Sequence, residues 1–152
     1  MRCVRVFTVF LLILSLLSAP AFAQHREVGL GIMVGDPTGL SAKYWTERDR
    51  AFDFGVGWSS LGQGSVHLHT DYLIHHFDLL KVGMEKFTLY YGLGARLRRE
   101  RDTQLGLRVP MGISYLFPRV PLDVFLEFVP LMDLVPSTSF GINAALGGRF
   151  YF

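Results

Sequence analysis

Residues Ser139–Phe152, with the sequence SFGINAALGGRFYF, decide the fold. One set of alternate residues is apolar: Phe140, Ile142, Ala144, Leu146, Gly148, Phe150 and Phe152. The other set holds the polar residues and two of the glycines: Gly141, Asn143, Ala145, Gly147, Arg149 and Tyr151. A period of two predicts a β-strand, because successive side chains of a strand point to opposite faces. A long apolar strand at the end of a soluble domain leaves an edge that invites aggregation, so we expect this strand to close a barrel inside lipid.

The same alternation recurs along the chain and predicts seven further strands. They are Glu27–Gly35, Leu40–Trp45, Ala51–Ser59, Ser65–His75, Phe87–Arg98, Leu105–Phe117 and Leu122–Val129. We expect Pro110 to cause a bulge or bend in its strand, and the segments 76–86 and 130–138 to be connections. An even number of strands joined by short turns predicts an all-β fold: an eight-stranded antiparallel up-and-down transmembrane β-barrel.

The first 23 residues predict a cleaved signal peptide. Arg2 and Arg5 precede the apolar run Val6–Leu17, and Ala21-Phe22-Ala23 supplies a cleavage pattern. The run is shorter than the roughly 20 residues of a membrane-spanning helix. We therefore expect residues 24–152 to form one barrel domain.

Removal of this peptide changes the charge of the chain. The 15 Lys and Arg residues fall by two and then equal the 13 Asp and Glu residues. A neutral chain does not indicate a nucleic-acid partner. The single cysteine, Cys3, leaves with the peptide, so a disulfide framework is not expected.

The glycines indicate which face of the sheet is inside. Ten of them lie on the less apolar face: Gly29, Gly31, Gly55, Gly57, Gly92, Gly94, Gly106, Gly112, Gly141 and Gly147. Glycine weakens a water-facing strand but makes room inside a narrow barrel. The apolar face then meets lipid, with aromatic residues near strand ends: Tyr44, Phe52, Trp58, Tyr72, Phe87, Tyr115, Phe117, Phe128, Phe140 and Phe150. A soluble periplasmic lipocalin-like β-barrel, with the apolar face inside, is the alternative.

This assignment sends charged side chains into the barrel. We predict an interior ion-pair network of Lys43, Asp53, Asp71, Arg96, Arg98, Arg108, Asp123, Glu127 and Arg149. Buried charges require pairing, because desolvation of a single ion is costly. Asn143 and the two histidines of the same face, His67 and His69, are expected beside them.

The segment His67-Leu68-His69-Thr70-Asp71 is the candidate for chemistry. A spacing of two places both imidazoles and the carboxylate on one face of a strand. A metal would require a third ligand from another strand, and the sequence indicates none. A hydrolase that modifies lipid is an alternative, with one of the inward serines Ser41, Ser59, Ser65 and Ser114 as nucleophile. We favour structural hydrogen bonding and predict no enzyme activity, no cofactor and no metal. His75 and His76 are expected to be solvated in a connection.

The terminal strand resembles the C-terminal signature of bacterial outer-membrane β-barrels, which end in an aromatic residue. That resemblance implies that Phe150 and Phe152 form the signal for the barrel-assembly machinery. Gly35–Trp45, GDPTGLSAKYW, resembles a motif of small uncharacterised outer-membrane barrels. The class includes the OmpA and OmpX type, whose outward loops are long, whereas the turns here are short. The resemblance implies a monomer in the outer membrane with both termini periplasmic and in contact with lipid and lipopolysaccharide, but it brings no activity. We expect a structural or surface-interaction role. The charged run Arg98–Asp102 is expected to be a solvated strand end and turn, with contact to anionic lipopolysaccharide as the alternative.

Overall fold

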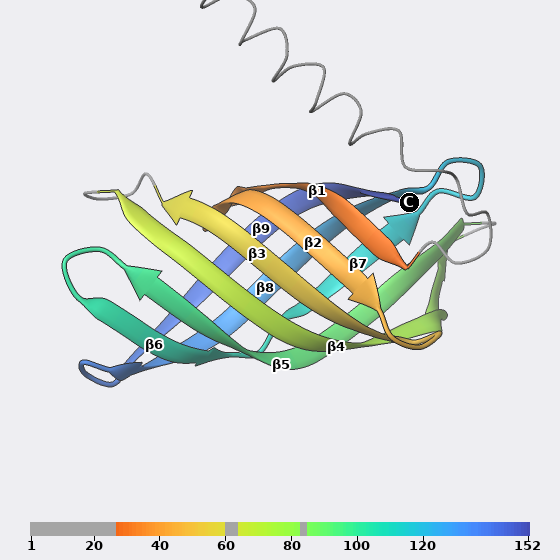
Figure 1. Ribbon diagram of the computed structural model, residues 1–152. Helices are drawn as coiled ribbons and strands as arrows, with labels where there is room; N and C mark the ends of the chain where they lie inside the picture. Colours follow the sequence, from red (N-terminus) through yellow and green to blue (C-terminus); the bar gives the residue numbers. More distant parts are fainter. Residues whose placement is uncertain (1–26, 60–63, 83–84) are drawn as a thin grey trace, which may run out of the picture.

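The computed structural model describes residues 27–59, 64–82 and 85–152, and these form strands and turns (Figure 1). Its nine strands are β1 (Val28–Gly35), β2 (Thr38–Trp45), β3 (Arg50–Ser59), β4 (Ser65–Val82), β5 (Glu85–Arg99), β6 (Thr103–Arg108), β7 (Met111–Leu116), β8 (Leu122–Val135) and β9 (Ser139–Tyr151). The predicted signal peptide, residues 1–23, lies outside the described residues. None of the described segments contains a helix long and apolar enough to cross a membrane.

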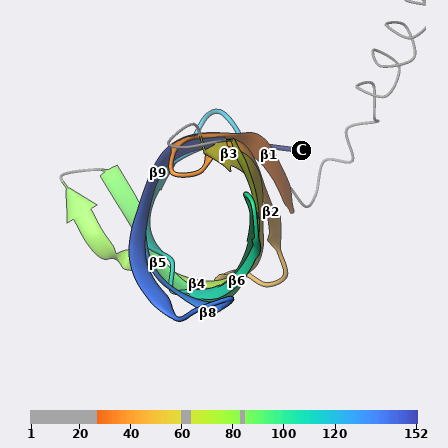
Figure 2. The same ribbon diagram turned by 90° about the vertical axis from the view of Figure 1, so that its left-hand side faces the viewer.

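The strands form a closed antiparallel ring, seen end-on in Figure 2. Leu30 of β1 pairs with Ala42 of β2 on one side and with Phe150 of β9 on the other. The first and last strands therefore close the sheet, as the alternation in the terminal strand predicted. β6 and β7 share one place in the ring, because both pair with β5 and with β8. The predicted all-β up-and-down fold is confirmed.

Pro110 divides the strand that the sequence predicted over Leu105–Phe117. β6 ends at Arg108 and β7 begins at Met111. Proline has no backbone N–H, so it interrupts the ladder. The Pro110 carbonyl still accepts a hydrogen bond from the Gly92 N–H at 2.9 Å, which holds the break against β5.

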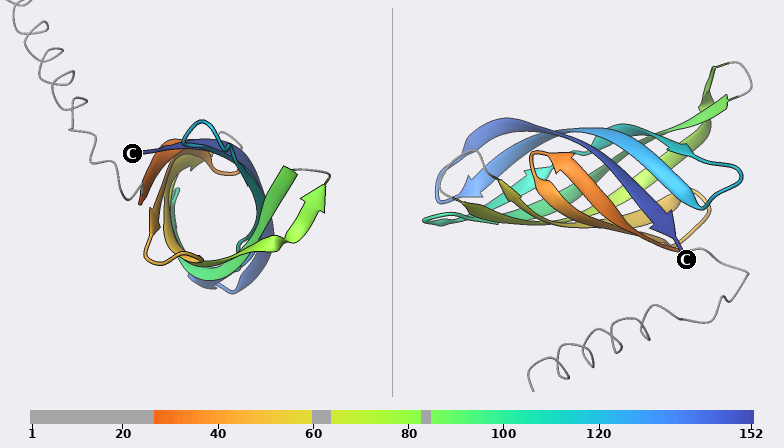
Figure 3. Two further views of the ribbon diagram at one scale, coloured as in Figure 1. Left: turned by 90° about the vertical axis from the view of Figure 1, so that its right-hand side faces the viewer. Right: turned by 90° about the horizontal axis from the view of Figure 1, so that it is seen from above.

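Two predicted connections are instead parts of strands. β4 runs to Val82 and β5 begins at Glu85, so most of segment 76–86 is a hairpin that projects beyond the ring (Figures 2 and 3). The register shifts between His76 and Leu80. Between these two pairs β4 has three residues where β5 has one, so β4 carries two extra residues. The ladder is interrupted there, which explains why alternation is lost. β8 continues through Pro130 to Val135, and only 136–138 separate it from β9.

The Gly35–Trp45 motif begins with a tight turn between β1 and β2. Gly35 has a φ of +139°, a conformation that side chains rarely adopt. The Thr38 hydroxyl donates to the Gly35 carbonyl at 2.9 Å and accepts from the Gly35 N–H at 3.1 Å. Glycine and threonine therefore fix the turn that aligns β1 with β2.

The two faces of the sheet differ sharply in composition. Apolar side chains cover the outside; Phe140 is 82% exposed and Ile142 is 75% exposed. A small apolar cluster inside contains Met33, Leu73, Tyr90, Phe125 and Ala145. Most other large buried side chains are charged or polar. The glycine-rich face is therefore the inner face.

Candidate functional site

The barrel interior contains a continuous set of buried ionisable side chains, which we call the interior network. Its members are Lys43, Asp53, His67, His69, Asp71, His75, Arg96, Arg108, Asp123, Glu127, Asp133 and Arg149. They come from β2, β3, β4, β5, β6, β8 and β9. Because these strands surround the interior, each cation meets partners that are distant in the sequence.

Arg149 on β9 connects several strands. Its Nη2 donates to both carboxylate oxygens of Asp53, at 2.9 and 3.0 Å. Its Nε donates to the Ser41 hydroxyl at 2.8 Å, and Nη1 lies 3.6 Å from Asp123 Oδ2. The guanidinium also lies 3.8 Å from the centroid of the Phe125 ring. This one side chain therefore holds β2, β3 and β8 together through charge-assisted hydrogen bonds and a cation–π contact.

Arg108 on β6 is the second centre of the interior network. Its Nε lies 2.9 Å from Asp71 Oδ1, and its Nη2 donates to Glu127 Oε1 at 3.1 Å. The other oxygen of Glu127 accepts a hydrogen bond of 2.9 Å from the Tyr90 hydroxyl. Arg108 Nη1 is 3.5 Å from His67 Nε2. The carboxylates of β4 and β8 thus share a guanidinium from β6.

Lys43 on β2 occupies the end of the interior next to the β4–β5 hairpin. Its Nζ lies 3.1 Å from His75 Nε2 and 3.8 Å from Asp123 Oδ2. The same nitrogen lies 4.9 Å from the centroid of the Tyr90 ring and 5.3 Å from that of Trp45. The ammonium group is therefore enclosed by an imidazole, a carboxylate and two aromatic faces.

The prediction that His75 is a solvated residue of a connection is wrong. It lies within β4, is 2% exposed, and packs its ring 4.4 Å from that of Trp45. Its Nδ1 lies 3.3 Å from the carbonyl oxygen of Asp49. The alternation of Ser65–His75 places His75 on the inward face together with His67 and Asp71. The burial of His75 could therefore have been predicted from the period of this strand.

Arg96 forms a separate pair with a residue that the sequence did not suggest. Its Nε and Nη2 donate to the two oxygens of Asp133, at 2.9 and 2.6 Å. Asp133 falls in the segment 130–138 that was predicted to be a connection, which is why it was missed. Arg98, predicted inside the barrel, is only half-buried and bonds to Ser65 and Glu100 at 3.2 and 3.3 Å.

His67, His69 and Asp71 lie together on the inner face of β4, and their surroundings differ. The rings of His67 and His69 lie 5.4 Å apart and nearly perpendicular. Asp53 on β3 is the direct register partner of Asp71. One ligand atom from each of Asp53, His69 and Asp71 lies within 4.8 Å of the others. Asp53 is therefore the ligand from another strand that the sequence did not indicate.

Two of the four inward serines bond to arginines. The Ser41 hydroxyl accepts from Arg149, and the Ser65 hydroxyl accepts from Arg98. Ser114 is buried on β7, and the side chain of Ser59 lies outside the described residues. The hydroxyls of Ser41 and Ser65 are held by guanidinium groups, an arrangement that does not activate a nucleophile.

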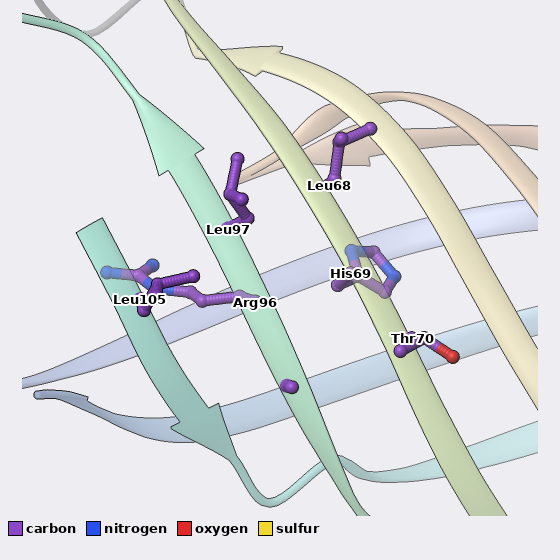
Figure 4. Close-up of a pocket in the computed structure, with 7 residues that line it drawn as sticks. Leu68, His69, Thr70, Arg96, Leu97 and Leu105 are labelled. Atoms are coloured by element: carbon purple, nitrogen blue, oxygen red, sulfur yellow. The ribbon is translucent and has the colours of Figure 1, made fainter. Parts of the chain in front are cut away.

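A groove of about 300 Å³ lies on the outer surface over three neighbouring strands. Figure 4 shows Leu68 and Thr70 of β4, Leu97 of β5 and Leu105 of β6 along it. Leu68 and Leu105 are 41% and 44% exposed, whereas His69 and Arg96 in the same wall are buried on the inner side. The groove is apolar and belongs to the outward surface.

The predicted assembly signal lies at the end of β9. Phe150 and Phe152 are 43% and 63% exposed, and their rings lie 5.3 Å apart. Both therefore project from the outer surface beside β1 and β8, the strands that pair with β9.

The architecture is similar to a known barrel. The N-terminal β-barrel domain of Pseudomonas aeruginosa OprF superposes with a TM-score of 0.58 over 82% of this chain and 95% of that domain, at 14% sequence identity. No protein-family model matches the chain, and no curated protein sequence matches it. At this identity the likeness shows the fold alone, an antiparallel β-barrel.

Proposed function

We propose that the chain is a small outer-membrane β-barrel with a non-enzymatic, structural or surface-interaction role. One observation carries the proposal: apolar side chains surround the outside of a closed barrel while ion pairs fill its inside. Exposed apolar surface is favourable in hydrocarbon and unfavourable in water. Closure of the sheet satisfies the backbone hydrogen bonds that lipid cannot satisfy.

A soluble lipocalin-like barrel requires the opposite distribution of side chains. Its apolar residues would line the inside, and its charges would face water. Here Arg108, Arg149 and Lys43 are each 1% exposed, whereas Phe140 is 82% exposed. The OprF barrel domain supports the same assignment through its fold.

Location in the outer membrane is tested by fractionation of cells that express the full chain. We expect the mature protein in the outer-membrane fraction, with a migration on a gel that changes on boiling, as closed barrels show. A protein recovered in the soluble periplasmic fraction would contradict the proposal.

The filled interior supports a role without catalysis or conduction. In a narrow barrel the space is occupied by side chains, here by Arg149, Arg108 and their partners. The lipid-modifying hydrolase remains the second candidate because His67, His69 and Asp71 share one face. His67→Ala and Asp71→Asn are the test, with lipid A acylation measured by mass spectrometry. If the wild-type protein changes lipid A acylation and neither variant does, the chain is an enzyme instead.

The partners that we propose follow from this location. Lipid and lipopolysaccharide would contact the outward surface, the latter at the turn Arg98–Asp102, where cations attract anionic headgroups. The barrel-assembly machinery would recognise Phe150 and Phe152. We propose a monomer, with both termini on the periplasmic side. The end of β9 and the start of β1 lie at the same end of the barrel (Figure 3).

A further inference from the structure

The buried charges of the interior do not balance. Among the described residues, the buried carboxylates are Asp53, Asp71, Asp123, Glu127 and Asp133. The buried cations are Lys43, Arg96, Arg108 and Arg149. Five carboxylates against four cations leave one negative charge in excess, if every group is ionised. An uncompensated charge inside a protein is strongly unfavourable, so the interior has a place for one more positive species.

Two of the five carboxylates meet where β3 pairs with β4. Asp53 and Asp71 are directly opposed in the ladder, and both are buried. Like charges at opposed positions repel each other. Arg149 bonds to Asp53 and Arg108 lies beside Asp71. Each of the two opposed carboxylates therefore has a guanidinium group beside it, and Arg108 is shared with Glu127.

His69 completes this group and has an unused nitrogen. It is 93% buried, since its exposed fraction is 7%, and its Nδ1 has no hydrogen-bond partner among the described residues. Neither oxygen of Asp71 makes a hydrogen bond of good geometry, although Arg108 Nε lies 2.9 Å from Oδ1. Buried polar atoms without partners are uncommon in proteins, and each calls for an explanation, of which an ordered water and a bound ion are two.

We propose that Asp53, His69 and Asp71 form a binding site for one divalent transition-metal ion of the zinc type inside the barrel. With a hydroxide as its fourth ligand, such an ion adds a single positive charge, which balances the excess. One imidazole nitrogen and two carboxylate oxygens suit zinc and its neighbours better than calcium or magnesium, which prefer oxygen ligands alone. Zinc bonds of about 2.0–2.2 Å place ligand atoms roughly 3.4 Å apart in a tetrahedron. The present separation of at most 4.8 Å is closed by small side-chain rotations.

The surroundings of the three side chains fit a metal site. Ligating carboxylates in proteins usually accept hydrogen bonds from a second layer of residues, and Arg149 and Arg108 occupy that position. Two glycines provide the space: a Cβ at Gly55 would overlap the His69 ring, and a Cβ at Gly94 would overlap the Asp71 carboxylate. The site is independent of the location of the protein in a cell, because it depends only on the folded barrel.

The experiment uses the full mature chain refolded in detergent after chelation. Samples receive Zn²⁺, Co²⁺, Ca²⁺ or Mg²⁺, and bound metal is measured by elemental analysis after removal of free ion. We expect one Zn²⁺ or Co²⁺ per chain, little Ca²⁺ or Mg²⁺, and a higher urea midpoint with Zn²⁺, because a ligand that binds only the folded state stabilises it. His69→Ala should weaken Zn²⁺ binding by at least about tenfold.

His67→Ala is the matched control, because His67 is also buried on the inner face of β4 but lies outside the ligand group. It should bind Zn²⁺ as the wild type does. Wild-type barrel that retains no Zn²⁺, or equal binding by His69→Ala and wild type, would overturn the proposal and leave a proton as the balancing charge. The wild-type measurement decides the question even if a variant does not fold.

Discussion

The Arg96–Asp133 pair permits a quantitative test of the interior network. Arg96 donates two hydrogen bonds, at 2.9 and 2.6 Å, to a carboxylate that is 6% exposed, and the pair is separate from the Arg108 and Arg149 centres. Arg96→Met keeps most of the side-chain volume and leaves the buried Asp133 charge without its cation, although the Ser139 hydroxyl still donates to Asp133 Oδ2 at 3.4 Å. Removal of one member of a buried pair costs about 3–5 kcal/mol. We expect Arg96→Met to lower the free energy of unfolding by that amount.

The second half of the test removes the remaining charge. Leucine has nearly the shape of aspartate, so Arg96→Met/Asp133→Leu replaces an ion pair by apolar contacts. Such replacements are often neutral or stabilising. The double variant should therefore be more stable than either single variant, with a coupling energy of roughly 3 kcal/mol or more.

Equilibrium urea unfolding of the mature chain in lipid vesicles, followed by the fluorescence of its two tryptophans, measures these values. Arg50→Met is the control, because Arg50 and Glu47 form an exposed pair at 3.7 Å. An exposed pair contributes at most about 1 kcal/mol. The reasoning fails if Arg96→Met costs no more than Arg50→Met, or if the double variant loses the sum of the two single losses.

Three further predictions test the packing, the lipid face and the end of the chain. Gly55→Ala should cost about 1–3 kcal/mol in the same unfolding assay, because a Cβ there overlaps the His69 ring. Gly148→Ala is the control and should change stability little, because its Cβ meets only a carbonyl oxygen at 3.5 Å. Equal costs for the two variants would refute the argument. Leu126→Arg should cost about 2–4 kcal/mol in vesicles if this outward side chain faces hydrocarbon, whereas a value near zero would favour a water-facing strand. Phe152→Ser should reduce the amount of protein in outer membranes while leaving unfolding in vesicles unchanged, and normal membrane levels would exclude Phe152 from the assembly signal.

The sequence alone predicted the strand pattern well, because alternation is a local property. The period of two in Ser139–Phe152 predicted β9 and its pairing with β1. Prediction failed where a local irregularity hides the period. A bulge between His76 and Leu80 obscured the end of β4, and Pro130 suggested a break in a strand that continues to Val135.

The candidate site depended more strongly on the tertiary structure. Alternation placed His69 and Asp71 on one face, but only the register between β3 and β4 opposes Asp53 to Asp71. The same register adds Asp53 to the group around His69, a relation that no spacing in the sequence contains.

The sequence alone was therefore enough to predict the central part of most strands, their antiparallel order along the chain, and which face is rich in glycine. The tertiary structure decided which charges meet: Arg149 with Asp53 and Arg96 with Asp133. The physical reason is that side-chain alternation is fixed by the geometry of each strand, whereas partners across a barrel depend on the stagger of all the strands around the ring.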